Sequence, residues 1–555
     1  MKLKPTIVLS FVSGLLAGAA YCHASLSVPA ELMLIAWVPL MWVLFGSPSQ
    51  GEPVRKGSVL PLYVAFFVFH GLSNWWISSW QAQTDPYLMA SGIAVWLAHP
   101  FFLMLPWLAL RWIGTKLTRS SVVFLVPFVT TAFEWLHGQT DLSYPWLSLG
   151  YSLIDRPLAQ VADVVGVYGL TFLIMTVNAL AFWALQRRRD GLGVALPLTI
   201  ALVVCAVWTV WGFAQQSAST QSRPVSRMKV ALVQPNINPW DKWSAPYEQL
   251  VIHRQITDSL IAAENSFDLA VWSETAIPYV IRNYRYLGDW VRLRTWIDTS
   301  GFSLLTGFAD MMVYENGSAP LSARSLAVDP SVKYDHFNAA MLLNAGESGP
   351  VVHRKTMLTP FAERLPFADQ MSFAMQWFEW GVGISSWGKG RERLPMEVRN
   401  GCLIRGTVGP IICIESIYPD VTRDMVNNGA DVLAIITNDA WYNGTWGPRQ
   451  HYDIARMRAI EMRRSIIRCA NSGVSGIIDQ SGHSTLELPE MRRTAAVGTV
   501  YSFRALTFYA RYGDWLPIIC AAVTLLVVLL ARFQLFLRIL PASLVRQSSH
   551  ISHNT

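Results

Sequence analysis

Charged residues are scarce in this chain. Only 15% of its 555 residues are Asp, Glu, Lys or Arg, whereas 52% are hydrophobic. A soluble domain carries about 25% charged residues, so an ordinary soluble protein is excluded. The chain instead contains several apolar runs that are long enough to cross the hydrocarbon core of a bilayer. Many of its 24 tryptophans lie near the ends of these runs, as is typical at membrane interfaces.

Cysteines are also few, and their spacing is not that of a metal site. The chain has six, without any Cys-x-x-Cys pair or zinc-type spacing, so no metal is expected. Cys22, Cys205 and Cys520 fall in apolar runs, where cysteine packs as a small hydrophobe. For Cys402 and Cys469 the sequence leaves two possibilities open, a disulfide between them or two free thiols.

The net charge of +7 does not indicate a nucleic-acid partner. Nucleic-acid binding requires basic residues gathered in one patch or stripe. Here they are gathered in short segments between the apolar runs, which is the pattern that orients membrane proteins. The expected partner is therefore a membrane, and no nucleic acid.

Eight apolar runs predict transmembrane helices. They lie at residues 6–22, 30–46, 59–79, 88–110, 121–136, 163–185, 193–213 and 514–533. The first, second and fifth are short or interrupted. The first run follows a basic start and resembles a secretory signal. We expect it to stay as a helix, because further runs follow at once and Tyr21 fits a cleavage site poorly.

Lysine and arginine in the loops predict the orientation. The loops after the second, fourth and sixth runs are basic, as are both termini, whereas the intervening loops are nearly free of basic residues. Both termini are therefore expected in the cytoplasm. The predicted organisation is a membrane domain at 1–213, an extracytoplasmic domain at 214–509, a closing helix at 510–535 and a cytoplasmic tail at 536–555.

The long segment between the last two runs has the pattern of an α/β domain. Apolar strands are predicted within residues 228–237, 267–278, 302–310, 337–345, 407–416 and 431–441. Helices are predicted at 245–264 and 450–470. Several strands end in polar residues, and side chains at strand ends form the active sites of α/β proteins.

Three side chains of this domain form a chemically complete set. Glu274 ends one predicted strand, Cys413 ends another, and Lys355 lies between them in the chain. A carboxylate can accept the proton of a thiol to give the nucleophilic thiolate. An ammonium group can stabilise the oxyanion of acyl transfer. Taken singly, each also has a structural interpretation: a buried core cysteine, a capping glutamate or a solvated lysine.

Four segments resemble a known superfamily when they are taken together. They are "VWSETAIP" (271–278), "KTMLTPFAERLPF" (355–367), "CIES" (413–416) and "TNDAWYNGTWGPRQHYDIARMRAIEMRR" (437–464). Their order resembles the nitrilase superfamily of carbon–nitrogen hydrolases, and the membrane framework narrows this to the apolipoprotein N-acyltransferase family. The resemblance implies a polytopic α-helical membrane domain of about eight transmembrane helices. Inserted in it is a nitrilase-like α/β domain, an αββα sandwich.

The resemblance also implies the catalytic residues. Glu274 is then the general base, Lys355 the oxyanion-stabilising ammonium and Cys413 the acylated nucleophile. Ser273 stands where the family often has proline, and Ile414 where it commonly has tyrosine. Because the backbone N–H of Ile414 survives this change, acyl transfer is expected to survive as well.

Further residues have supporting roles by the same resemblance. Glu363 is similar to an additional family glutamate that supports the triad, although a loop ion pair would also explain it. Glu415 is expected to orient the site, and Asn338 to lie near the lysine segment. Trp243 resembles a tryptophan at the substrate entrance, with Trp240 as the neighbouring alternative.

The activity implied is acyl transfer without a cofactor. A phospholipid gives its sn-1 acyl chain to Cys413 as a thioester, and the N-terminal α-amine of S-diacylglyceryl-cysteine on an apolipoprotein then takes it. The expected location is the bacterial inner membrane, with the catalytic domain on the periplasmic side, and the expected state is a monomer. The aromatic segment 371–387 is either a lid at the membrane surface or a packing segment.

Two other functions remain open at this point. A membrane-anchored amidase would use water to resolve the acyl-enzyme. A transporter or receptor would bind its ligand without chemistry, but it would be expected to carry charged residues well inside its helices. The few candidates, Glu134, His137, His70 and His99, are sparse.

Overall fold

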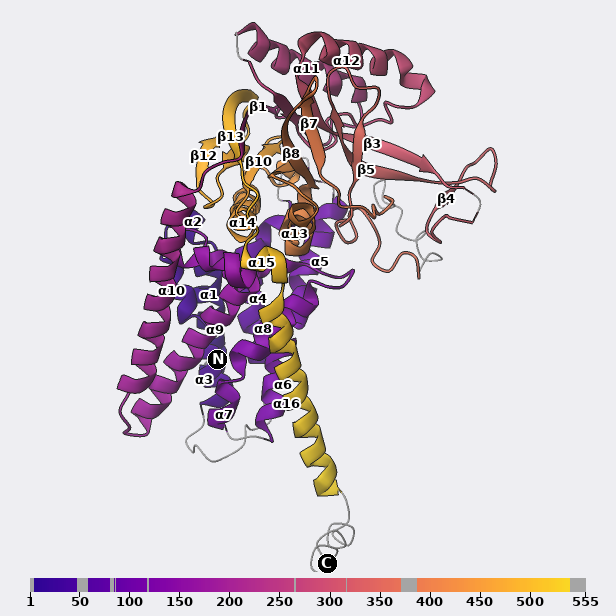
Figure 1. The fold of residues 1–555 in the computed structure, drawn as a ribbon. Coiled ribbons are helices and arrows are strands. Elements are labelled where there is room, and N and C mark those ends of the chain that lie inside the picture. The colour runs from indigo at the N-terminus through magenta and orange to yellow at the C-terminus, as the bar shows by residue number, and fades with distance from the viewer. Residues whose placement is uncertain are drawn as a thin grey trace, which may run out of the picture.

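The computed structural model describes residues 4–46, 58–79, 84, 86–116, 119–263, 266–315, 317–370 and 387–539. It consists of a helical domain below a domain of two β-sheets (Figure 1). The aromatic segment considered as a lid lies outside the described residues, except for Trp387.

The N-terminal part of the chain is helical. Its α-helices are α1 (Pro5–Tyr21), α2 (His23–Leu26), α3 (Val38–Phe45), α4 (Leu60–Asn74), α5 (Pro86–Leu103), α6 (Leu105–Gly114), α7 (Arg119–Val123), α8 (Val126–His137), α9 (Ala162–Arg189) and α10 (Ala195–Gln221). Small residues let α1 pack closely on α4, because a Cβ at Gly14 would come within 2.2 Å of the carbonyl oxygen of Ala65.

Within the described residues, five apolar helices are long enough to cross a membrane. They span Leu60–Ser78, Leu88–Gly114, Pro157–Arg189, Ala195–Ser219 and Trp515–Phe533. The other three predicted runs, which are short or interrupted in sequence, form shorter apolar helices at Pro5–Tyr21, Ala30–Phe45 and Ser121–His137. The count of eight spans and the domain boundaries therefore stay predictions.

Two sheets form the middle of the second domain. The first has the order β13-β1-β2-β3-β5-β4, with β6 beside β5, and the second has the order β12-β11-β10-β9-β8-β7. In each sheet three central strands are parallel, and their carboxyl ends therefore meet at one edge. The strands are β1 (Ser226–Gln234), β2 (Leu269–Trp272), β3 (Ser303–Val313), β4 (Arg324–Ser325), β5 (Lys333–Leu343), β6 (Val351–Arg354), β7 (Met396–Asn400), β8 (Leu403–Ile412), β9 (Val432–Thr437), β10 (Ser465–Ala470), β11 (Gly476–Ile478), β12 (Ser484–Glu487) and β13 (Thr494–Ser502).

Helices cover the outer faces of both sheets. Alternate residues of one strand serve opposite faces, so Ile412 of β8 packs between the sheets while Ile411 packs under the helices. The first sheet is covered by α11 (Pro246–Ala262) and α12 (Leu287–Ser300), the second by α13 (Pro419–Asn427) and α14 (Gly447–Met462). The result is the αββα order expected from the sequence (Figure 1).

The sandwich rests on the helical domain through its second sheet. Ile414, Tyr418 and Ile454 belong to the same buried cluster as side chains of α1, α4 and α9. The chain leaves the sandwich through α15 (Phe508–Tyr512) and ends the described part in α16 (Trp515–Ile539), which runs along the helical domain (Figure 1). The cysteine turn described below therefore lies close to the membrane helices.

The predicted helix at 450–470 is wrong in its last part. α14 ends at Met462, Arg463 adopts a left-handed conformation with φ 48°, and Ser465–Ala470 forms β10. Every residue of β10 is buried. A central parallel strand is apolar on both faces, so its sequence lacks the alternation that distinguishes a strand from a helix.

Both cysteines considered for a disulfide are free thiols. Cys402 is exposed, whereas Cys469 is buried between the sheets. The Sγ atom of Cys469 lies 3.2 Å from the carbonyl oxygen of Val233 and 3.1 Å from that of Val271.

Candidate active site

Cys413 occupies a sharp turn at the carboxyl end of a central strand. β8 ends at Ile412, and Cys413 begins the short 3₁₀ helix η8 (Cys413–Ile417). Its φ of 50° lies in the left-handed region, which is strained for a residue with a Cβ. The turn leaves Cys413 half-buried, whereas Ile412 is fully buried. The cysteine is therefore held directly after a rigid strand, and part of its surface stays exposed.

Lys355 lies at the centre of a buried carboxylate cluster. It directly follows β6, and its side chain is only 1% exposed. Its Nζ atom lies 3.2 Å from Oε1 of Glu274 and 2.9 Å from Oε1 of Glu363. A buried ammonium group needs such partners, because an unpaired charge in the interior is costly. The structure thus brings Glu274, Lys355 and Glu363 together.

Asn338 of β5 closes this cluster. Its Nδ2 atom donates to Oε1 of Glu274 at 2.7 Å and to Oε1 of Glu363 at 3.0 Å. Its carbonyl oxygen accepts from the backbone N–H of Lys355 at 2.9 Å. The second oxygen of Glu363 accepts from the backbone N–H of Thr359 at 2.8 Å. Hydrogen bonds therefore hold both carboxylates in place, each with one oxygen on Lys355.

Burial and neighbouring charges act against each other at these groups. Burial alone would lower the pKa of Lys355, but Glu274 and Glu363 raise it above its usual range, so the ammonium group is retained. Burial alone would raise the pKa of Glu363, but Lys355 lowers it. Burial raises the pKa of the Cys413 thiol, Glu274 adds to the rise, and Lys355 opposes it. Cys413 therefore becomes a thiolate only if a base accepts the thiol proton.

Glu415 links the cysteine turn to the lysine segment. It is fully buried, and its Oε1 atom accepts from the N–H and the hydroxyl of Thr356, both at 2.7 Å. Its Oε2 atom accepts from the N–H of Ile412 at 2.8 Å and lies 3.3 Å from Nε2 of His353. Burial alone would raise the pKa of Glu415, but His353 and these hydrogen bonds lower it to about 2. An ionised carboxylate thus fixes the spacing of the two segments.

The side chain of Ile414 points away from this cluster. It is 8% exposed and belongs to the apolar cluster shared with the membrane helices.

Trp243 is half-buried in the loop after β1. The ring of Trp240 stands edge-on to Trp441, with centroids 4.9 Å apart. Which of the two tryptophans contacts substrate stays a prediction.

Lys242 supports Glu274 and was not predicted from the sequence. It is 2% exposed, and its Nζ atom donates to the carbonyl oxygen of Glu274 at 2.7 Å and to the hydroxyl of Thr275. Thr275 has a left-handed φ of 45°, and Gly307 is required beside it, because a Cβ there would come within 2.3 Å of its backbone nitrogen. Burial lowers the pKa of Lys242 to about 7. The sequence signal that could have indicated Lys242 is its position between Trp240 and Trp243.

His451 and Asp439 support the cysteine turn and were also missed. Nε2 of His451 lies 2.8 Å from the hydroxyl of Ser416 and 3.2 Å from the carbonyl oxygen of Cys413, and Nδ1 lies 2.8 Å from Asp439. Asp439 also accepts from Arg468 at 2.9 Å. Both ring nitrogens are thus occupied, so His451 positions the turn. Asp439 follows a strand and was detectable, whereas His451 lies inside a helix.

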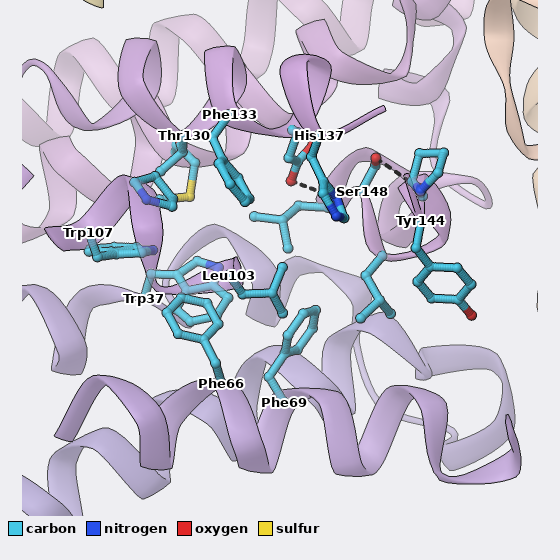
Figure 2. Close-up of a pocket in the computed structure, with 16 residues that line it drawn as sticks. Trp37, Phe66, Phe69, Leu103, Trp107, Thr130, Phe133, His137, Tyr144 and Ser148 are labelled. Carbon is cyan, nitrogen blue, oxygen red and sulfur yellow. Dashed lines mark hydrogen bonds between the residues drawn. The ribbon is translucent and has the colours of Figure 1, made fainter. Parts of the chain in front are cut away.

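A small cavity lies among the membrane helices, apart from this cluster (Figure 2). Its volume is about 50 Å³, and aromatic side chains such as Phe66 and Phe69 line much of it. Glu134 lies in its wall, but one of its oxygens accepts from a backbone N–H at 3.2 Å and the other from Thr171 at 2.7 Å. This carboxylate is engaged in helix packing, which gives no support to a transport pathway.

Comparison with known proteins identifies both parts of the chain. Residues 13–180 match a family model described as "Apolipoprotein N-acyltransferase N-terminal domain", and residues 229–500 match one described as "Carbon-nitrogen hydrolase". An apolipoprotein N-acyltransferase of Chlorobaculum tepidum is 32% identical over 95% of this chain and 97% of its own. One of Azotobacter vinelandii is 31% identical over 81% of each chain. Among solved structures, an amidase from Nesterenkonia is 14% identical, with a TM-score of 0.34 over 52% of this chain and 96% of its own.

Proposed function

The chain belongs to the apolipoprotein N-acyltransferase family, and on this premise we propose how its own residues carry out acyl transfer. The donor is a phospholipid, and the acceptor is the N-terminal α-amine of S-diacylglyceryl-cysteine on an apolipoprotein. Cys413 holds the acyl group between the two. The single observation that carries the proposal is the Lys355 cluster, in which one ammonium group contacts two oriented carboxylates.

In the first step the thiol of Cys413 attacks the sn-1 ester. Glu274 accepts the thiol proton as the sulfur bonds to the carbonyl carbon. Lys355 stabilises the oxyanion that develops, because its charge is fixed in a water-poor site. The C–O bond of the ester then breaks, and Glu274 returns the proton to the leaving oxygen. The products are a thioester and a lysophospholipid.

In the second step the acceptor amine attacks the thioester. Glu274 accepts a proton from the amine, and Lys355 again stabilises the oxyanion. The C–S bond breaks, and the proton passes to the sulfur, which restores the thiol. An amide on the lipoprotein results. A thioester is reactive enough for an amine and persists between the steps if water is kept away.

Glu363, Asn338 and Glu415 act as positioning residues in this scheme. Glu363 supplies the second negative charge that keeps Lys355 protonated, and Asn338 orients the base through its bond to Glu274. Glu415 maintains the spacing between nucleophile and ammonium. Ile414 contributes its backbone N–H to the oxyanion, and Trp243 contacts the substrate.

The proposed setting is a bacterial inner membrane, with the catalytic domain on the periplasmic side and both termini in the cytoplasm. The basic ends of the membrane helices support this orientation, since α6 carries Arg111 in its last turn and α9 ends with three arginines. The enzyme acts as a monomer without a cofactor.

Intact-protein mass spectrometry tests the proposal. The purified protein is incubated with phospholipid, and an added mass equal to one acyl chain is expected. Cys413→Ala should abolish it, whereas Cys402→Ala, which removes an exposed cysteine of the same domain, should keep it. A diacylated lipopeptide should then remove the adduct. An adduct that persists in Cys413→Ala, or that water removes as fast as the lipopeptide does, contradicts the proposal.

A further inference from the structure

A second cavity lies where α10 meets the sandwich, away from the Cys413 cluster. Its volume is about 700 Å³. The last turns of α10, the start of α9 and the segment 503–508 form most of its wall, together with Arg463 and Gln480. Glu274, Lys355 and Cys413 are not among its lining residues.

Two buried acceptor atoms in this wall have no hydrogen-bond partner within the described part of the chain. They are Oδ1 of Asp163 and Oε1 of Gln480, on residues that are 6% and 7% exposed. The other ends of both side chains are engaged, since Oδ2 of Asp163 accepts from Arg463 at 2.8 Å and Nε2 of Gln480 donates to the carbonyl oxygen of Ser219. Buried acceptors are nearly always satisfied. Both oxygens are almost fully covered by protein atoms, so these two side chains must turn toward the cavity to meet a ligand. An ammonium group has three N–H donors and would then satisfy both.

Arginines add positive charge to the same cavity. Arg223 and Arg504 are exposed lining residues. Arg504 donates through Nε and Nη2 to Asp431, at 2.8 and 3.2 Å, which leaves further N–H groups for a ligand. Arginine is well suited to binding phosphate. The wall therefore offers acceptors for a cation, and the exposed arginines offer donors for an anion.

The cavity also opens beside a helix that faces outward. Only 11% of the most apolar window of α10 is buried within the protein. Trp208 and Trp211 of this helix line the cavity, and so do Leu506 and Phe508, which are 36% and 46% exposed. Figure 1 shows α10 along the outer side of the helical domain, reaching up to the sandwich. Tryptophans at such a junction are typical of the headgroup level of a membrane.

From these contacts we propose that the cavity binds one phospholipid whose phosphate headgroup ends in a primary ammonium group. The ammonium group donates to Asp163 and Gln480, the phosphate accepts from Arg223 and Arg504, and the acyl chains lie along α10. The lipid is held at this site and is not consumed, and it fills the junction between α10 and the sandwich. The inference goes beyond acyl transfer and does not rest on it.

Native mass spectrometry of the full chain in detergent tests this, in a Cys413→Ala background so that no lipid is consumed. Phosphatidylethanolamine and phosphatidylcholine with the same acyl chains are compared. The quaternary ammonium of phosphatidylcholine cannot donate hydrogen bonds, so the ethanolamine lipid should be retained about tenfold more tightly. Equal retention of the two lipids would overturn the proposal.

Two tryptophan substitutions on α10 provide a matched pair. Ala218→Trp fills the cavity, whereas Ala214→Trp places the same ring at an exposed alanine that does not line it. Only Ala218→Trp should remove the preference for ethanolamine, and Gln480→Met should reduce it. Phosphatidylethanolamine should raise the thermal unfolding midpoint of the Ala214→Trp protein but not of Ala218→Trp. Both tryptophan variants could instead retain phosphatidylethanolamine as tightly as the Cys413→Ala protein does, or both could lose it equally. Either result would mean that the lipid belongs to the general layer around the membrane helices, and the proposal would be wrong.

Discussion

Gln450 and His451 are neighbours on α14 that contact different domains. Oε1 of Gln450 accepts hydrogen bonds from the indole N–H groups of Trp146 at 2.9 Å and Trp76 at 3.1 Å, both from the helical domain. His451 lies 3.2 Å from the carbonyl oxygen of Cys413. One turn of one helix therefore joins the membrane helices to the Cys413 turn.

Gln450→Leu should weaken this connection. Trp76 keeps a second acceptor, the carbonyl oxygen of Ser73 at 3.0 Å, but the buried N–H of Trp146 loses its acceptor. The expected loss of stability is about 1–3 kcal/mol, seen as a lower thermal unfolding midpoint together with slower acyl-enzyme formation. Gln370→Leu, at an exposed glutamine, is the control. A change of midpoint no larger than that of the control would contradict the role of Gln450.

Glu274→Gln should slow acyl-enzyme formation by roughly 100- to 10,000-fold, the range for loss of a general base. The amide keeps the shape of the side chain, and Lys355 keeps Glu363 as an ionic partner, so the fold should persist. The measurement is the rate at which the acyl adduct appears on Cys413. Glu397→Gln, at a half-buried position of β7 in the same domain, should leave the rate unchanged. A loss below about tenfold would assign the base to another group.

Lys242→Met should reduce activity without removing any group of the triad. The substitution takes away the hydrogen bonds to the Glu274 carbonyl oxygen and to Thr275, so the strained turn that carries the base loses its support. Acyl-enzyme formation should slow by about tenfold or more, as expected for the loss of these two hydrogen bonds from a buried lysine. Lys333→Met, at the half-buried first residue of β5, is the control. Equal rates of acyl-enzyme formation for both variants would show that the hydrogen bonds of Lys242 do not support Glu274.

Glu415→Gln should change how stability depends on pH. The pKa of Glu415 is about 2 in the folded protein and about 4.3 in an unfolded chain, so ionisation favours the folded state above pH 5. This contribution, about 3 kcal/mol, is lost as the pH falls from about 5 to about 2. The difference in thermal midpoint between wild type and Glu415→Gln should therefore shrink over that range. A difference that stays constant with pH would contradict the ionised state of Glu415.

Part of the site can be predicted from the sequence, because two of its residues directly follow predicted strands. Polar residues after central strands share an edge of the sheet, and this rule points to Glu274 and Cys413 from the sequence alone. Lys242 and His451 were not accessible in this way. Their partners are main-chain carbonyl oxygens of distant segments, and such contacts depend on how α14 and the loop after β1 pack.

The fold shows a similar limit. The αββα layers follow from strands and helices with clear periodicity. At β10, however, the sequence predicts a helix, because a strand buried on both faces carries no alternation. The cavity beside α10 has no signal in local sequence at all. It is formed by residues from 163 to 508, which only the packing of the two domains brings together.

A single-turnover experiment with position-specific labels tests the central claim most directly. The phospholipid carries different isotopic labels in its sn-1 and sn-2 chains, and mass spectrometry follows both labels from lipid to protein to lipopeptide. We predict that the sn-1 label appears first on Cys413 and then, at the same rate as it leaves the protein, on the lipopeptide amine. Appearance of label on the lipopeptide before or without the Cys413 adduct would contradict the account.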